Sequence, residues 1–443
     1  MIDKILDNKF LFIGIHLSLG FIVTFLPIAK IYSFLILAIS IVVIYKTKNK
    51  NEEALYLASY LAGSEVFIRM SGGTLLYETG KYGLILFALL GLFLGPVNHK
   101  RNVAYLIVIL LLLIGIVFSE APPGASIRKA ILFNLSGPIS LAIFAIYCFH
   151  RTITLTQLKE FLFMCLLPIF SMISYVYFRT PDLEEMVFGT LSNFKTSGGF
   201  GPNQVATMIG FGAFILGAFL FIRVQLSVYL FLDGLFLAYF IYRGLLTFSR
   251  GGMITAGTAF LFFAIFMFSF QKVTLVKISK YVFISFVLFL GIWLYTSNIT
   301  GGMIANRYAG QNAAGVKKKD ISAGRGKIIS TQLEGFYESP IFGIGVGNGK
   351  FKREESGKKI TAASHNEVGR LIEEHGALGI IALFILLIVP LHNMYFSNNF
   401  QRAFLSAFYI FWFLTINHSA MRIAFPAFVY GLSLIRIVPD EAE

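Results

Sequence analysis

The sequence predicts an all-α polytopic membrane protein with about 12–14 transmembrane helices and one large extracytoplasmic loop that contains short helices. Apolar residues make up 56% of the 443-residue chain and charged residues only 14%, which is typical of membrane proteins. The 48 phenylalanines exceed what a water-exposed surface tolerates. Only one long polar segment, residues 297–375, interrupts the apolar pattern.

The apolar segments have the length of membrane crossings, which need roughly 17–25 mostly apolar residues each. Two closely spaced pairs leave their number open between about 12 and 14. The segments centre near Gly20, Leu37, Ala62, Phe87, Leu111, Ala142, Ile169, Ala213, Gly234, Phe262, Leu288, Leu383, Tyr409 and Val429. The first follows Lys4 and Lys9 without a small-residue cleavage site, so we expect a retained helix rather than a removed signal peptide.

Basic residues recur in alternate short loops, as they do in the cytoplasmic loops of membrane proteins. These residues are Lys46, Lys48, Lys50, Lys100, Arg101, Arg151, Lys272, Lys277 and Lys280. With a cytoplasmic N-terminus, the polar loop 297–375 then faces the opposite compartment. Membrane orientation explains the net charge of +14, so we expect the lipid bilayer, and no nucleic acid, as a partner.

The sequence lacks the motifs of metal and redox chemistry. It contains no His-Glu-x-x-His, Cys-x-x-Cys or Asp-x-Asp pattern, so we expect neither a metal nor a cofactor. Cys148 and Cys165 lie in apolar segments and are expected to be packing residues. The glycine-rich run 343–349 lacks the spacing of a phosphate-binding loop. We therefore expect it to be a re-entrant turn after Pro340.

Two arginines flanked by glycine lie on the side of the polar loop. Arg250 precedes Gly251 and Gly252, and Arg325 lies between Gly324 and Gly326. Each alone is explained by an interfacial arginine or a solvated basic turn. Together they favour a site for an anionic phosphate group, which guanidinium groups bind bidentately without a metal. We interpret the glycines as allowing close approach of the backbone to a ligand.

A histidine lies at a predicted helix start. Ser364 followed by Glu367 has the spacing of a capping box, which predicts a helix beginning at His365. The positive end of the helix dipole disfavours an imidazolium there, so His365 would be neutral and able to act as a general base. The alternative is an ordinary surface histidine on a capped helix. Glu374 is nine residues on and out of phase, so we expect a structural or positioning role.

Four motifs, taken together, resemble those of the O-antigen ligase and polymerase superfamily of bacterial envelope glycan transferases. The motifs are Gly-Phe-Gly-Pro-Asn-Gln-Val-Ala at 199–206, Ser-Arg-Gly at 249–251, Gly-Arg at 324–325 followed by Pro340 and the glycine run, and His-Asn at 365–366 with Glu-His-Gly at 374–376. The family's aromatic after the loop arginine is replaced by Ile329. The resemblance covers roughly residues 195–380.

The resemblance implies three regions: N-terminal transmembrane helices (1–194), an O-antigen ligase-like core with a periplasmic loop (195–380), and C-terminal transmembrane helices with a short cytoplasmic tail (376–443). It also implies a multi-pass protein of the bacterial inner membrane whose active site faces the periplasm. Nucleotide-sugars are not expected in that compartment, so an activated donor must arrive on a lipid.

The resemblance further implies a metal-independent, inverting glycosyltransferase that takes its glycan from a polyprenyl-diphosphate carrier. Arg250 and Arg325 would hold the diphosphate, and His365 would deprotonate the acceptor hydroxyl. Residues with a possible role in substrate binding are Arg243, Lys327, Asn366, Glu374 and Lys81, the last with Glu78 in a loop near the donor sugar. Within the apolar segments, Glu65 and Arg69 are spaced to pair on one helix face, and Asp233 is expected mid-helix without an assigned role.

The members of this superfamily differ in the acceptor that receives the glycan. A ligase passes the glycan to lipid A-core, a polymerase passes it to a second lipid-linked repeat, and a related branch glycosylates protein. We favour the ligase, because the long loop carries the fuller set of ligase-type motifs. A lipid-linked glycan flippase or transporter is the alternative from another class. Transporters show related halves and polar sites at mid-membrane, whereas this chain has no evident repeat and gathers its polar residues in one loop.

Overall fold

The protein is a bundle of long helices, seen in a computed structural model that describes residues 8–96, 102–318, 320, 325–355 and 365–440. Helices form nearly all the regular structure of these residues, which confirms the predicted all-α class. The helices are α2 (Lys9–Phe25), α3 (Ala29–Thr47), α4 (Glu53–Met70), α5 (Thr79–Leu94), α6 (Ala104–Ile114), α7 (Ile127–Cys148), α8 (Leu155–Arg179), α9 (Pro202–Phe221), α10 (Leu230–Leu246), α11 (Arg250–Gln271), α12 (Leu275–Ile299), α13 (Met303–Tyr308), α14 (Arg325–Glu338), α15 (Asn348–Glu355), α16 (Glu367–Tyr395), α17 (Asn399–His418) and α18 (Phe425–Leu432).

Seven of the described helices are long and apolar enough to cross a membrane: α3, α7, α8, α9, α11, α12 and α16. Shorter apolar helices are α2, α5 and α6 with the 3₁₀ turn that extends it to Phe118. Every predicted segment centre lies inside a helix. The segment near Val429, however, is wrong as a crossing, because α18 has only 8 residues and reaches about 12 Å. The total of 12–14 crossings stays a prediction.

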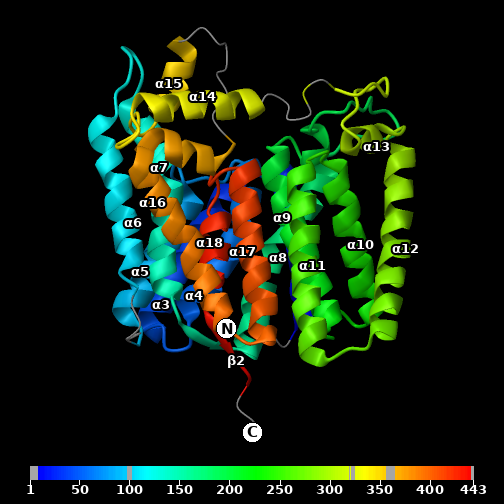
Figure 1. Ribbon diagram of the computed structural model, residues 1–443. Coiled ribbons are helices and arrows are strands. Elements are labelled where there is room, and N and C mark those ends of the chain that lie inside the picture. Colours follow the sequence, from blue (N-terminus) through cyan, green and yellow to red (C-terminus); the bar gives the residue numbers. More distant parts are fainter. Residues whose placement is uncertain (1–7, 97–101, 319, 321–324, 356–364, 441–443) are drawn as a thin grey trace.

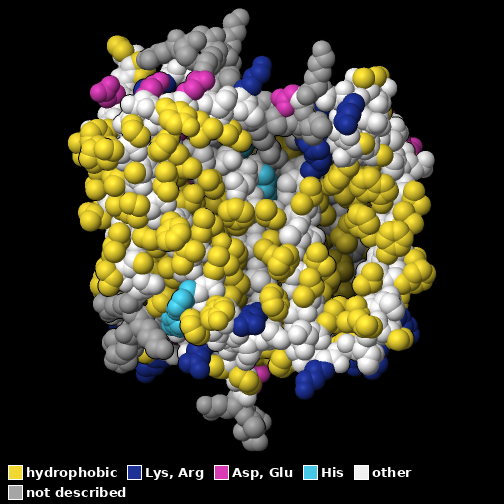
Figure 2. Space-filling model, viewed as in Figure 1, with side chains coloured by type: hydrophobic (Ala, Val, Ile, Leu, Met, Phe, Trp, Pro, Cys, Tyr) yellow, Lys and Arg dark blue, Asp and Glu magenta, His cyan; other side chains and the backbone are white. Residues whose placement is uncertain are grey.

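Polar elements gather at one end of the bundle, which we call the loop-side end (Figure 1). It carries α13, α14 and α15, whereas the small parallel pairing of β1 (Thr152–Thr154) with β2 (Arg436–Val438) lies at the opposite end. Between the two ends, the face in Figure 2 is a broad band of hydrophobic side chains. Lys and Arg side chains dominate the edge opposite the loops in that view. This distribution is that of a multi-pass membrane protein.

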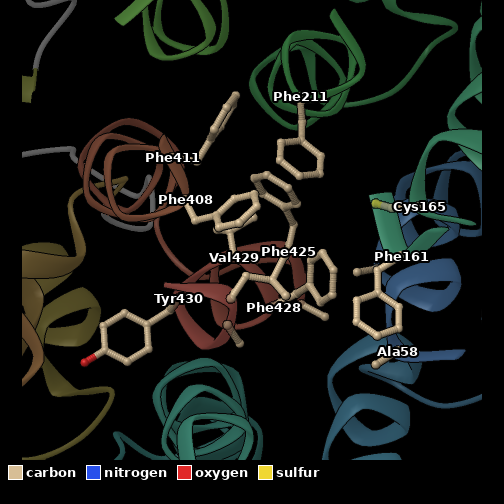
Figure 3. Packing of buried hydrophobic residues seen from close by; sticks show 14 of the residues in the cluster. Ala58, Phe161, Cys165, Phe211, Phe408, Phe411, Phe425, Phe428, Val429 and Tyr430 are labelled. Atoms are coloured by element: carbon tan, nitrogen blue, oxygen red, sulfur yellow. The ribbon is translucent and has the colours of Figure 1, made fainter. Parts of the chain in front are cut away.

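Aromatic side chains fill the core around α18. Phe425 and Phe428 of α18 are fully buried, and Phe425 stacks edge-on against Phe211 of α9 with 4.8 Å between ring centroids. Phe211 also contacts Phe411 of α17 at 5.0 Å, as Figure 3 shows. Such edge-to-face pairs add about 0.5–1.5 kcal/mol each beyond the buried area. The short helix α18 is therefore a central packing element.

Helix α16 has two parts. Gly376 has φ 59° and ψ −136°, a backbone conformation that only glycine adopts readily. A side chain there would also meet the backbone of Gly343 and Ile341 at under 3 Å. Residues 367–375 form a short helical segment at the loop-side end, and the remainder of α16 runs through the bundle.

Asp233 lies in the first turn of α10 rather than mid-helix. Its carboxylate accepts hydrogen bonds from the backbone N–H of Leu226 (2.9 Å) and Ser227 (3.0 Å), and the residue is buried. It therefore fixes the turn that enters α10, which gives a structural role to a residue that had none assigned. Cys148 and Cys165 are buried free thiols, as expected for packing residues.

Candidate functional site

Two of the sequence motifs meet at the loop-side end, although 46 positions separate them. Ser249, the residue before α11, donates its hydroxyl to the amide oxygen of Asn203 in the first turn of α9 at 2.8 Å. The amide nitrogen of Asn203 donates to the carbonyl of His418 at the end of α17. The Pro-Asn and Ser-Arg-Gly motifs thus join three helix ends, and Arg250 is held at that junction.

The two glycines after Arg250 serve helix packing, which corrects their interpretation as a ligand approach. A Cβ on Gly251 would lie 2.5 Å from the ring of His418 in α17. A Cβ on Gly252 would lie 2.5 Å from the backbone of Ala206 in α9. Any larger residue would push these helices apart, because packed interiors have no room for an added methyl group.

Arg250 is the first residue of α11 and is partly buried. The N-terminus of a helix carries a partial positive charge and unsatisfied N–H groups, both of which favour a bound anion. The guanidinium of Arg250 adds a full charge at the same place. This helix end is therefore well suited to hold phosphate oxygens.

Two further cations lie beside Arg250, and the sequence motifs did not reveal them. Arg307 of α13 donates to the carbonyl of Phe248 through Nε and to that of Thr190 through Nη1, each at 3.1 Å. Lys318 donates its ammonium to the same Thr190 carbonyl at 3.1 Å. The shared partner brings these two cations together next to α11. We call Arg250, Arg307 and Lys318 the cationic cluster.

The electrostatics of the cationic cluster show that like charges crowd one another. Desolvation, followed by repulsion from Arg307 and Arg250, lowers the pKa of the Lys318 amine. Burial raises the pKa of the neighbouring Tyr308 to about 12, although Arg250 and Arg307 oppose that rise. A site in which cations destabilise one another gains free energy when it binds an anion.

The other predicted arginine lies on α14, at the loop-side end. Arg325 begins α14, but its side chain and Gly324 lie outside the described part of the chain. Lys327 lies in the first turn of the same helix and is exposed. A Cβ on Gly369 would meet the amide of Gln332 at 2.3 Å, so α14 packs closely on the first part of α16. The helix that carries Arg325 is thus in contact with the helix that follows His365.

The helix after His365 begins later than predicted. Asn366 is its N-cap, with its side-chain oxygen accepting from the N–H of Gly369 at 3.0 Å, and α16 begins at Glu367. Ser364 lies outside the described residues. Glu367 forms an ion pair with Arg370 and accepts from the N–H of Met421. The predicted start at His365 is therefore wrong by two residues, because Asn366 supplies the cap; His365 precedes the first turn and is partly buried.

The carboxylates near His365 are bound to arginines. Arg370 bridges Glu367 and Glu374, with 3.2 Å between its Nη1 and the Glu374 carboxylate. Arg353 of α15 pairs with Glu373 at 3.0 Å. All five side chains are buried. Glu374 therefore has a structural partner, in agreement with the positioning role expected for it. We call Glu367, Arg370, Glu374, Arg353 and Glu373 the paired network.

The glycine-rich run is a structural turn around the break in α16. Ile344 and Gly345 donate their backbone N–H groups to the carbonyls of Glu373 and Glu374 at 3.0 and 3.2 Å. These carbonyls lie where Gly376 interrupts the helix, so the run replaces the hydrogen bonds that the kink removes. Because these amides are occupied, they are not a phosphate cradle. The expectation of a turn after Pro340 is confirmed.

Lys81 and Glu78 do not lie in an exposed loop. Glu78 is the residue before α5 and Lys81 lies in its first turn, and both side chains are buried, with Lys81 0% exposed. Lys81 contacts Glu78 at 3.4 Å and donates to Ser136 at 3.1 Å. Arg69 pairs with Glu78 at 3.1 Å and with Glu65 at 3.5 Å, which confirms the expected Glu65–Arg69 pair. Lys81 is therefore enclosed by protein in α5, which corrects its placement in a loop; its contact with the donor sugar stays a prediction.

Arg243 is also enclosed. It lies in the last turn of α10 and donates through Nη2 to the carbonyl of Val176 and the hydroxyl of Thr180, both at the end of α8. These contacts of Arg243 are with α8 and not with the cationic cluster, so its role in substrate binding stays a prediction. Among the described residues, no group of three or more His, Cys, Asp or Glu side chains is arranged to hold a metal ion.

The fold is that of a multi-pass membrane protein, and it carries a cationic cluster at one end. Residues 235–384 match the O-antigen ligase family, a stretch that includes the cationic cluster, Arg325 and His365. This stretch is similar to the O-antigen ligase family, a group of membrane glycosyltransferase-like enzymes, which confirms the resemblance inferred from the motifs. No curated protein matches the chain at a significant level.

Proposed function

We propose that the protein transfers a glycan from a polyprenyl-diphosphate carrier to an acceptor hydroxyl on the periplasmic side of the inner membrane, with lipid A-core as the acceptor. The observation that carries this proposal is the cationic cluster at the N-terminus of α11, within the region that matches the O-antigen ligase family. Arg325 is assigned to the same diphosphate on the motif alone.

The charge of the donor fits this site. A diphosphate carries several negative oxygens, and it becomes more negative as the bond to the sugar breaks. Guanidinium groups bind such oxygens through paired N–H donors. Donors placed where charge develops stabilise the transition state most. In this mechanism Arg250 and Arg307 bind the diphosphate, and relief of the repulsion at Lys318 favours binding further.

The transfer is a single displacement. The acceptor oxygen attacks the anomeric carbon as the bond from that carbon to the diphosphate oxygen breaks. His365 takes the proton of the acceptor hydroxyl, and the diphosphate leaves with the bonding electron pair. Attack from the face opposite the leaving group inverts the anomeric centre. No step requires a metal or a redox partner.

The distribution of basic residues supports the sidedness of the proposal. Lys46, Arg151 and Lys272 lie at or beyond the ends of α3, α7 and α11 that face away from the loop-side end. Such residues favour the cytoplasm, so the cationic cluster would face the periplasm. A carrier lipid that presents its diphosphate at the periplasmic surface of the membrane would then meet the site directly.

The function is tested by reconstitution in liposomes with a polyprenyl-diphosphate glycan as donor. Three acceptors are offered in parallel: lipid A-core, a second lipid-linked repeat, and a glycosylatable protein. We expect the glycan to appear on lipid A-core, with loss of transfer in the Arg250→Ala protein. Transfer to the second repeat would instead make the protein a polymerase, and transfer to protein an oligosaccharyltransferase. Movement of the intact donor across the bilayer without transfer would overturn the proposal in favour of a flippase.

A further inference from the structure

A second feature, separate from the cationic cluster, is an apolar cavity on the side of the bundle. It has a volume of about 310 Å³ and lies between α2, α8 and α10. Its wall includes Leu17 of α2, Ile173 of α8, and Leu235 and Tyr239 of α10. The volume is at the lower end of that found for small-molecule sites. A cavity of this size and lining accepts part of one hydrocarbon chain rather than a whole lipid.

Arg243 lies one helical turn beyond Tyr239, at the end of the cavity nearer the loop side. The residue is only 2% exposed. Its Nη2 donates to neutral groups, the carbonyl of Val176 at 3.2 Å and the hydroxyl of Thr180 at 2.6 Å. Its Nε is buried and has no hydrogen-bond partner among the described residues. The Nε–H group of Arg243 is therefore able to donate a hydrogen bond to a ligand.

The surroundings of Arg243 leave its charge uncompensated. Its electrostatic neighbours are the tyrosines Tyr239, Tyr242 and Tyr177, and no carboxylate of the described chain lies within ion-pair distance of it. A buried charge without a counter-ion is costly, whereas an anion bound beside it offsets that cost. By contrast, each arginine of the paired network has a carboxylate within 3.2 Å. Arg243 thus differs from the structural arginines of the same protein.

The arrangement of charge and cavity matches a lipid in a bilayer leaflet. Helices α8 and α10 both run toward the loop-side end, since α8 ends at Arg179 and α10 leads into Arg250. Arg243 is in the last turn of α10, and the cavity residues of α10 precede it, deeper in the apolar band. A lipid of the loop-side leaflet would have the same order, with its phosphate above its chains.

We propose that an anionic phospholipid of the loop-side leaflet binds here, with its phosphodiester on Arg243 and one hydrocarbon chain in the cavity between α2, α8 and α10. A phosphodiester carries one negative charge, which matches the single guanidinium, whereas the diphosphate of a carrier lipid is accounted for by the cationic cluster. A zwitterionic head group would add an ammonium to an already positive site, so a net anionic lipid is favoured. The proposal does not depend on glycan transfer.

The test is lipid retention by the purified full-length protein. The protein is reconstituted in vesicles of phosphatidylglycerol and phosphatidylcholine, extracted, washed with detergent, and its bound lipid is identified by mass spectrometry. We expect enrichment of phosphatidylglycerol over its share in the vesicle by about tenfold, which corresponds to about 1.4 kcal/mol of preference. We also expect a higher Tm in phosphatidylglycerol than in phosphatidylcholine, since a ligand of the folded state stabilises it.

Two variants separate the contributions of charge and cavity. Arg243→Met should abolish the preference for phosphatidylglycerol, and Leu235→Trp should reduce retention of both lipids by filling the cavity. The matched control is Phe231→Trp, on an α10 side chain that is 77% exposed and outside the cavity lining; it should retain lipid like the unaltered protein. Retained lipid of the same composition as the vesicle would overturn the proposal. The proposal would also be overturned if a polyprenyl diphosphate, and no other lipid, displaced phosphatidylglycerol, because the cavity would then belong to the donor.

Discussion

Two charged regions at the loop-side end are built in opposite ways. In the paired network, Arg370 and Arg353 each contact a carboxylate, and these pairs tie the first part of α16 to α15 and to the segment before α18. In the cationic cluster, Arg307 and Lys318 both donate to one backbone carbonyl, and they repel each other and Arg250. One region pairs each arginine with a carboxylate, and the other brings three cations close to one another.

The difference separates structural roles from binding roles. An ion pair that is already formed gains little from a ligand, and breaking it leaves a buried charge. A cluster of like charges is relieved by an anion, so it is suited to bind one. The same residue types thus have different functions according to their partners. In Figure 2, most of the acidic side chains at the loop-side end lie over the half that carries α14 and α15, and Lys and Arg side chains are prominent over the half with α11 to α13.

The largest effect is expected at His365, which lies beside the paired network but is proposed to act on the acceptor. His365→Ala should reduce glycan transfer by about 10²–10⁴-fold, the usual contribution of a general base. The Tm should not change, since the cap of α16 is supplied by Asn366. Transfer is measured in donor-loaded liposomes and the Tm by a thermal shift. Full activity of the His365→Ala protein would exclude the general-base role.

Arg250→Ala should lower transfer by about 10²–10³-fold, the typical cost of removing one group that stabilises transition-state charge. We expect the same for Arg325→Ala. Arg250→Lys should rescue poorly, because lysine lacks the bidentate fork. Arg128→Ala is the control, since Arg128 is an exposed arginine in the first turn of α7. Equal losses in the control would mean that surface charge, and not the site, governs the rate.

Arg370→Gln tests the paired network. The substitution leaves the carboxylates of Glu367 and Glu374 buried without their cation, which costs about 3–5 kcal/mol in comparable sites. We therefore expect a clearly lower Tm and less folded protein, measured by thermal shift and size-exclusion chromatography. An unchanged Tm would show that this network does not hold α16 in place, and the contrast between the two regions would fail.

Arg307→Gln should have the converse result. Loss of a charge-assisted contact of about 1.5 kcal/mol weakens binding of the donor by about tenfold. The Tm should change little, because removal of one repulsive charge offsets the loss of the hydrogen bonds from Arg307 to Phe248 and Thr190. Donor affinity is measured by competition with a labelled polyprenyl diphosphate. A fall in Tm without a change in affinity would place Arg307 among the structural arginines.

The pH dependence of donor binding gives the smallest effect. The pKa of Lys318 is lowered by desolvation and by its neighbouring arginines. The protonated amine binds the diphosphate, so affinity should be constant at low pH and fall as pH rises through the lowered pKa. Lys318→Arg should extend the plateau to higher pH, since arginine stays protonated. Identical pH profiles for the two proteins would remove Lys318 from the site.

Periodicity and composition were sufficient to predict the fold class, because every apolar segment must become a helix to satisfy its backbone in a membrane. They could not predict that the segment near Val429 is a short buried helix, since its apolar residues pack on Phe211 and other core aromatics rather than lipid. The start of α16 was misplaced by two residues because two side chains, Ser364 and Asn366, both suit an N-cap.

The candidate site was predicted only where a local motif marks it. Arg250, Arg325 and His365 were found by their neighbours in sequence. Arg307 and Lys318 have no such pattern, and their proximity to Arg250 arises because α13 and the following turn fold back on Thr190. Their only signal was their location in the same polar loop. Conversely, burial of Lys81 depends on contacts with Glu78 and Ser136, which no local pattern encodes.

The most direct test of the central claim is the affinity of a polyprenyl diphosphate for a protein in which Arg250, Arg307 and Lys318 are all replaced by glutamine. Binding is compared with that of the unaltered protein at the same ionic strength, and the Tm of both is recorded. The account predicts that binding is lost while the Tm changes little, because relief of the repulsion among the three cations offsets the loss of the hydrogen bonds that Arg307 and Lys318 donate. Undiminished binding by the triple variant would contradict it.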